Sequence, residues 1–271
     1  MELTFLACSL ILYLLATAGF VAHLIARDGA PRLPLLLLAL AFALDTTALT
    51  IRAATLGGFG IVSFHDQLSL LAWLIVGLYL IVQFRYQLAV VGALVSPLAF
   101  LLTLSAYIVY AGVRTLPRNL QTAWLPAHVA PAFLGYAVFA VAFCISLIYL
   151  LQESQLKGKR RWAMLRRLPS LETLDELNYR FVAWGFALFT IGIITGSLLA
   201  KATWGAFWSW EPVQVLSMLA WLLYAVLLQT RSAGWRGRKA AALTIAGFAL
   251  LVISFFGVNL VFPGRHSGAF G

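Results

Sequence analysis

Long apolar runs are the feature of this sequence that most restricts its fold. Crossing a hydrocarbon core of about 30 Å takes roughly 20 helical residues, and about eight runs are long enough. The chain is 62% hydrophobic and only 10% charged, whereas soluble domains are nearer half apolar and a quarter charged. The sequence therefore predicts an all-α polytopic transmembrane bundle of about eight helices, forming one membrane domain over residues 1–271. The runs cover residues 3–25, 34–54, 67–83, 88–110, 126–151, 179–200, 213–230 and 240–261.

Basic residues are concentrated in every second connection between these runs, which predicts the orientation of the chain. By the positive-inside rule the basic connections are cytoplasmic, so both termini are expected on the non-cytoplasmic side. The first run has no Lys or Arg before it and no small-residue cleavage site, which favours a retained helix over a signal peptide. We expect a bacterial inner membrane protein. The basic connections hold Arg27, Arg32, Arg85, Lys157, Lys159, Arg160, Arg161, Arg166, Arg167, Arg231, Arg236, Arg238 and Lys239.

The formal net charge of +10 would suggest nucleic acid in a soluble protein. In a membrane protein, basic clusters at helix ends are better explained by anionic lipid headgroups. We therefore expect membrane lipids as partners and no nucleic acid.

Few polar residues interrupt the apolar runs. Asp45 lies near the middle of the second run, where an ionised carboxylate costs a few kcal/mol unless it is paired. Arg52 follows on roughly the same helical face, and Thr46 and Thr47 could donate hydrogen bonds. A structural contact is favoured here over the alternative of an ion or proton path. His65, next to Asp66 at the start of the third run, is interpreted as part of a hydrated pair.

Short local patterns predict helix contacts and ends. Gly192 and Gly196 form a small-residue pair four apart, which allows close helix approach. Thr173 followed by Glu176 is typical of a capping box at a helix start. Cys8 and Cys144 lie inside apolar runs and form no CxxC or CxxCH motif. We found no nucleophile, metal-cluster or nucleotide-loop motif.

The Trp-rich segment, residues 204–215, has a composition that a plain membrane helix does not need. It carries Trp204, Trp208, Trp210 and the acid Glu211 before a proline. The spacing of residues 204, 208 and 211 places them on one face of a helix, which predicts a short surface helix. An aromatic belt at the membrane interface is the alternative. The density of aromatics in one connection favours a large planar ligand such as haem.

Two histidines are predicted to emerge beside this segment. His128 follows Pro126 in the first turn of the fifth helix, where the helix dipole favours a neutral imidazole. His266 follows the eighth run. Two imidazoles from different helices could bind both faces of haem iron. Nearby cations that could pair with the haem propionates are Arg114, Arg118, Lys201 and Arg265.

These motifs resemble a known family. The Trp204–Gly205 and Trp208–Pro212 stretches, the histidine before a Gly-Tyr-Ala helix, and the closing Gly-Arg-His-Ser-Gly resemble the tryptophan-rich "WWD" signature of the CcsA/CcmC/HemX-like cytochrome c assembly proteins, with a family core at roughly 65–271. The resemblance implies haem handling on the outer face for attachment to apocytochrome c, together with other maturation proteins. It implies non-covalent haem b bound by His128 and His266 over Trp204, Trp208 and Trp210.

The chain departs from the family pattern in ways that bear on its role. Glu211 stands where the family usually has Asp, and Gln214 stands where an acid is common. No histidine lies plainly in mid-bilayer, unlike the full synthases. The chain is therefore expected to present, carry or sense haem rather than to complete ligation as an enzyme by itself. A HemX-like role in regulating glutamyl-tRNA reductase is the alternative, and small-ion transport through Asp45 is a third hypothesis.

Overall fold

The computed structural model describes residues 1–25, 31–56, 63–110, 112, 122–158 and 168–260. Within these ranges the regular structure is helical, in eight helices that are each long and apolar enough to cross a membrane. They are α1 (Glu2–Ile25), α2 (Arg32–Leu56), α3 (Phe64–Tyr86), α4 (Ala89–Ile108), α5 (Trp124–Lys157), α6 (Leu171–Trp204), α7 (Pro212–Ser232) and α8 (Arg238–Leu260). The predicted fold class and the predicted runs are confirmed.

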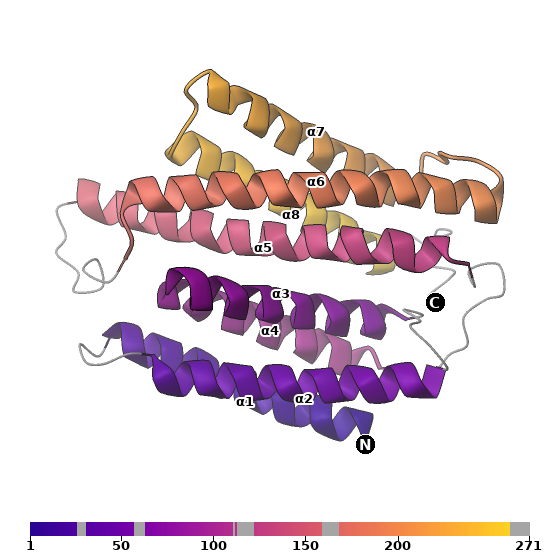
Figure 1. The fold of residues 1–271 in the computed structure, drawn as a ribbon, viewed down its shortest axis with the longest axis horizontal. Coiled ribbons are helices and arrows are strands. Elements are labelled where there is room, and N and C mark those ends of the chain that lie inside the picture. The colour runs from indigo at the N-terminus through magenta and orange to yellow at the C-terminus, as the bar shows by residue number, and fades with distance from the viewer. Residues whose placement is uncertain (26–30, 57–62, 111, 113–121, 159–167, 261–271) are drawn as a thin grey trace.

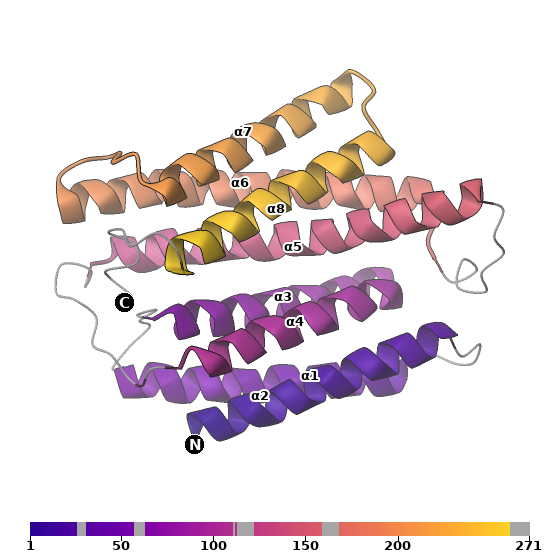
Figure 2. The ribbon, with the colours of Figure 1, turned by 180° about the vertical axis from the view of Figure 1, so that it is seen from behind.

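Helices α5 and α6 form the centre of the molecule. Each has 34 residues, or about 51 Å of helix, which exceeds the roughly 30 Å of the hydrocarbon core. Helices α3 and α4 pack on one side of this pair, with α1 and α2 beyond them, and α7 and α8 pack on the other side (Figures 1 and 2). The molecule is thus a stack of antiparallel helix pairs.

One end of the stack gathers segments that are far apart in the sequence. Helices α1, α3, α5 and α7 begin there, and α2, α4, α6 and α8 end there (Figure 1). We call this the Trp end, because it carries the connection between α6 and α7. Whether the Trp end faces the non-cytoplasmic side stays a prediction.

The close approach of α5 and α6 depends on glycine. A Cβ added to Gly192 would lie 3.0 Å from Ala132 Cα, and one added to Gly135 would lie 3.1 Å from the Phe189 nitrogen. Backbone atoms cannot easily give way, so larger residues would push the helices apart. The predicted helix contact at Gly192 is confirmed.

The opposite end is fixed by one aspartate. The carboxylate of Asp175 in α6 accepts a hydrogen bond from Arg231 Nη1 at 2.6 Å and from the Gly237 N–H at 2.7 Å. The start of α6 is set by Ser170, whose Oγ accepts from the Thr173 N–H at 3.1 Å. The predicted capping box at Thr173 and Glu176 is wrong, because the helix begins three residues earlier.

Asp45 has partners on α1. Its two carboxylate oxygens accept from Ser9 Oγ and Tyr13 Oη, each at 2.6 Å. The hydroxyls of Thr46 and Thr47 donate instead to carbonyls of their own helix. Asp45 therefore makes a structural contact that joins α1 to α2, as favoured, although the expected donors are wrong.

Candidate functional site

The connection between α6 and α7 is irregular. Helix α6 ends at Trp204 because Gly205 adopts the left-handed conformation, with φ +81°, and its N–H donates to the Lys201 carbonyl. Glycine populates this region without a steric penalty. Pro212 then begins α7, with Glu211 at the N-cap position. The predicted surface helix over Trp204, Trp208 and Glu211 is wrong, because the glycine cap interrupts it.

Side chains from both flanking helices hold this connection. Ser197 Oγ donates to the Phe207 carbonyl at 3.2 Å, and Lys201 Nζ donates to the Gly205 carbonyl at 2.9 Å. From α7, Gln214 Oε1 accepts from the Ser209 N–H at 2.8 Å and from Ser209 Oγ at 3.2 Å. Lys201, expected to be a partner for haem propionates, thus also shapes the segment. Sequence reasoning singled out position 214 but missed this contact, since an amide five residues away carries no recognisable motif.

The aromatic side chains form an exposed surface. Trp210 is 78% exposed and Phe207 is 52% exposed. Trp208 and Trp210 meet edge to face, with centroids 5.7 Å apart. Trp210 has φ +57°, a strained conformation for a bulky residue that costs about 1 to 3 kcal/mol. Strained residues of this kind cluster at active sites and ligand-binding sites.

The indole N–H of Trp208 is buried next to this surface. Its ring is half-buried, and its Nε1 has no hydrogen-bond partner among the described residues. A buried N–H without an acceptor is unfavourable by about 1 to 3 kcal/mol. Trp204, at the end of α6, is also half-buried.

His128 is oriented by α6. Helix α5 begins at Trp124, so His128 is its fifth residue rather than part of the first turn. Its Nδ1 lies 2.8 Å from the Gly192 carbonyl oxygen, which can only accept, so Nδ1 carries the proton. The lone pair of the neutral ring is therefore on Nε2. Metal-binding histidines commonly have this arrangement, with the second nitrogen held by a carbonyl.

Glycine at position 196 makes room for this ring. A Cβ at Gly196 would lie 2.7 Å from His128 Cε1 and 2.8 Å from Nδ1. The next residue, Ser197, binds the Phe207 carbonyl. One turn of α6 thus contacts both the imidazole of His128 and the Trp-rich segment. His128 and the Trp-rich segment thus lie at the same end of the bundle, where neighbouring residues of α6 meet each of them.

Several predicted residues lie outside the described part of the chain. These are His266, Arg114, Arg118, Arg265 and most of the basic connection at 157–167. Their predicted roles stay predictions.

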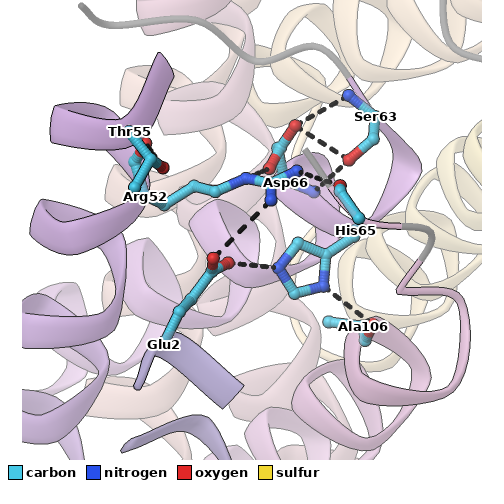
Figure 3. Close-up of polar contacts among 8 residues, drawn as sticks. Glu2, Arg52, Thr55, Ser63, His65, Asp66 and Ala106 are labelled. Carbon is cyan, nitrogen blue, oxygen red and sulfur yellow. Dashed lines mark hydrogen bonds and ion pairs between the residues drawn. The ribbon is translucent and has the colours of Figure 1, made fainter. Parts of the chain in front are cut away.

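A second polar group lies at the Trp end, among α1, α2 and α3 (Figure 3). Arg52 Nε donates to Asp66 Oδ1 at 2.8 Å, and His65 Nε2 lies 3.1 Å from Glu2 Oε1. His65 and Asp66 are 3% and 4% exposed, so the expected hydrated pair is wrong. Sequence reasoning also missed Glu2, since nothing local relates it to a histidine 63 positions away.

Comparison with known proteins identifies the family. Residues 62–266 match the model of the family described as cytochrome C assembly protein. The chain belongs to this family. With eight helices able to span a bilayer, it is an integral membrane protein.

Its relatives include proteins named cytochrome c biogenesis protein CcsA. The one from Parasynechococcus marenigrum is 32% identical, over 98% of this chain and 94% of the relative. The one from Prochlorococcus marinus is 33% identical, over 86% and 82%, respectively. The one from Chlamydomonas reinhardtii is 29% identical, over 92% and 72%. The similarity thus extends over most of each protein.

Proposed function

We propose that this protein takes part in cytochrome c biogenesis by binding haem at the Trp end and presenting it there. Haem is its cargo, held without a covalent bond and passed to apocytochrome c with the help of other maturation proteins. The relatives' shared name supports the process. The geometry of the Trp end supports the cargo.

The position of His128 beside the Trp-rich segment is the observation that carries this proposal. Residues 196 and 197 are neighbours in α6; one contacts the imidazole and the other holds the Phe207 carbonyl. The proposed iron ligand and the Trp-rich segment are thereby both contacted by one turn of α6. A porphyrin needs both, since iron requires an axial donor and the macrocycle requires apolar faces.

Each described residue has a distinct proposed role. His128 Nε2 is the axial ligand, with Nδ1 fixed by Gly192. Trp208 and Trp210 contact the macrocycle, and Trp204 and Glu211 border the site. His266 is proposed as the second axial ligand, by resemblance to the family.

The proposed role is presentation, because the described residues offer an exposed aromatic surface and a histidine that can bind iron. Bond formation between haem and a cysteine of the apocytochrome would take place on a partner. The orientation follows from the charge pattern, with the Trp end on the outer side of a bacterial inner membrane.

Absorption spectroscopy of the purified protein tests this function. Wild type from haem-supplied cells is expected to show a Soret band. The His128→Ala variant should lose most of this band, and the His128→Ala, His266→Ala double variant should lose all of it. Trp184→Ala is the matched control, because this exposed α6 tryptophan lies outside the Trp-rich segment. A wild type without a Soret band, or a double variant with an unchanged one, would contradict the proposal.

A further inference from the structure

The His65 ring contacts an oxygen atom at each of its nitrogens. Nδ1 lies 2.8 Å from the Ala106 carbonyl oxygen, and Nε2 lies 3.1 Å from Glu2 Oε1 (Figure 3). The carbonyl can only accept, so Nδ1 carries a proton. A neutral His65 would then direct the Nε2 lone pair at an ionised carboxylate. Rotating the ring by half a turn would replace both nitrogens with carbons. The contact requires one more proton, on Nε2 or on Glu2.

The surrounding charges favour this additional proton. Arg52 is 4% exposed and compensates Asp66, with Nε 2.8 Å from Oδ1. Glu2 is 9% exposed, and Arg52 Nη1 lies 3.6 Å from its Oε2. With the proton, the four side chains Glu2, Arg52, His65 and Asp66 sum to zero charge. Without it, they carry one negative charge in a buried site, which is strongly unfavourable.

A small cavity extends this group toward the middle of α2. It has a volume of about 10 Å³, which is the space for about one water molecule. Two polar atoms among its lining residues, Arg52 Nη1 and Ser69 Oγ, have no hydrogen-bond partner within the described chain. Asp45 and Glu2 also line it. A water in this cavity would have donors and acceptors from four side chains.

We propose that this buried group is a proton-binding site, in which His65 and Glu2 share one proton and a water molecule connects them to Asp45. The proton comes from solvent and returns to it, so no other reactant is needed. Among the described residues, the charged and titratable groups of this site lie on α1, α2 and α3, or directly after α4. They are Glu2, Tyr13, Asp45, Arg52, His65, Asp66 and Tyr110, whose ring meets His65 edge to face at 5.0 Å.

The site couples protonation to helix packing. Glu2 is in the first turn of α1, whereas His65 is in the first turn of α3. Loss of the shared proton would place a carboxylate against a lone pair, so this contact between the two helices would become repulsive. The start of α1 is therefore held to α3 by a proton.

Nitrogen NMR of the ¹⁵N-histidine-labelled full chain, with infrared detection of protonated carboxyls, tests the proposal. The chain has four histidines, and His65→Gln assigns one of them. In the wild-type protein we expect either a doubly protonated His65 or a protonated Glu2. A neutral His65 beside an ionised Glu2 would overturn the proposal.

Glu2→Gln is the decisive variant, because it keeps the shape and removes the need for the proton. The amide of Gln can donate to Nε2, so His65 is expected to become neutral at about pH 8 with the fold retained. Glu172→Gln, an exposed acid in the first turn of α6, is the control and should change nothing. An unchanged proton signal in Glu2→Gln would contradict the proposed pair.

The link to Asp45 has its own test. In Asp45→Asn the nearby negative charge is removed, so the pH at which the pair loses its proton should fall. Filling the cavity with Ser69→Val should weaken that shift. An unchanged midpoint in Asp45→Asn would overturn the water connection. The haem Soret band should be unaffected in Glu2→Gln, so this site and the proposed haem site can fail separately.

Discussion

The absence of a side chain at residue 196 determines where the His128 imidazole lies. We predict that Gly196→Ala displaces this ring, because the new Cβ would lie 2.7 Å from Cε1. The hydrogen bond from Nδ1 to the Gly192 carbonyl should break. Loss of such a supporting bond typically lowers metal affinity about 10- to 100-fold.

Haem titration followed by the Soret band measures this effect. Gly257→Ala in α8 is the matched control, since within the described part of the chain an added Cβ there meets only Ile253 Cγ2, at 4.0 Å. Equal haem affinity in the two variants would show that His128 does not bind the iron.

Single polar groups at a distance were the hardest residues to predict. Asp45 was identified from its cost in an apolar run, but its donors Ser9 and Tyr13 lie on another helix, 36 and 32 positions earlier. Arg52 was assigned to Asp45 by helical spacing, yet it binds Asp66. Spacing places residues on a face of their own helix but cannot say which helix that face meets.

At the level of the connection between α6 and α7, Gln214 replaces the acid expected from the family resemblance. Both hydrogen bonds to its Oε1 come from donors on Ser209, so a carboxylate could accept them equally well. We predict that Gln214→Glu keeps the Trp-rich segment in place. Gln214→Leu should leave the Ser209 N–H unpaired, at a cost of about 1 to 3 kcal/mol.

Limited proteolysis and the haem spectrum together measure the order of this segment. Gln214→Leu should increase cleavage near Trp210 and reduce haem binding, whereas Gln214→Glu should match wild type. A cleavage pattern in Gln214→Leu identical to wild type would exclude a role for this amide in shaping the segment.

Helices were predictable where their length is set by the membrane. All eight apolar runs became helices because an unpaired backbone is too costly in hydrocarbon. The conformation of the connection between α6 and α7 was predicted incorrectly. The helical spacing of residues 204, 208 and 211 does not reveal that Gly205 has a positive φ, which ends the helix. The contact between Trp208 and Trp210 agrees with the aromatic density that composition alone indicates.

One arginine links three helices at the Trp end. Arg52 of α2 contacts Asp66 of α3 at 2.8 Å and Glu2 of α1 at 3.6 Å. We predict that Arg52→Ala lowers the stability of the N-terminal helices by about 3 to 5 kcal/mol, because it leaves buried acids without their partner. Thermal unfolding in detergent measures this loss.

An exposed ion pair provides the comparison. Arg180 and Glu176 pair on the surface of α6, with side chains about half exposed, where such pairs contribute little. Arg180→Ala should therefore unfold at nearly the wild-type temperature. If Arg52→Ala did the same, the buried group would not hold the three helices together.

For the whole molecule, the charge pattern and the helix arrangement together predict which end faces outward. The Trp end carries the exposed residue Ala206, and the opposite end carries the exposed residue Ala233. In a background with Cys8 and Cys144 replaced by Ser, we predict that Ala206→Cys is labelled by a membrane-impermeant maleimide in spheroplasts. Ala233→Cys should be labelled only after the membrane is broken, because the basic connections face the cytoplasm. The reverse labelling would place the His128 and Trp-rich site inside the cell, where it could not present haem to an apocytochrome on the outer face.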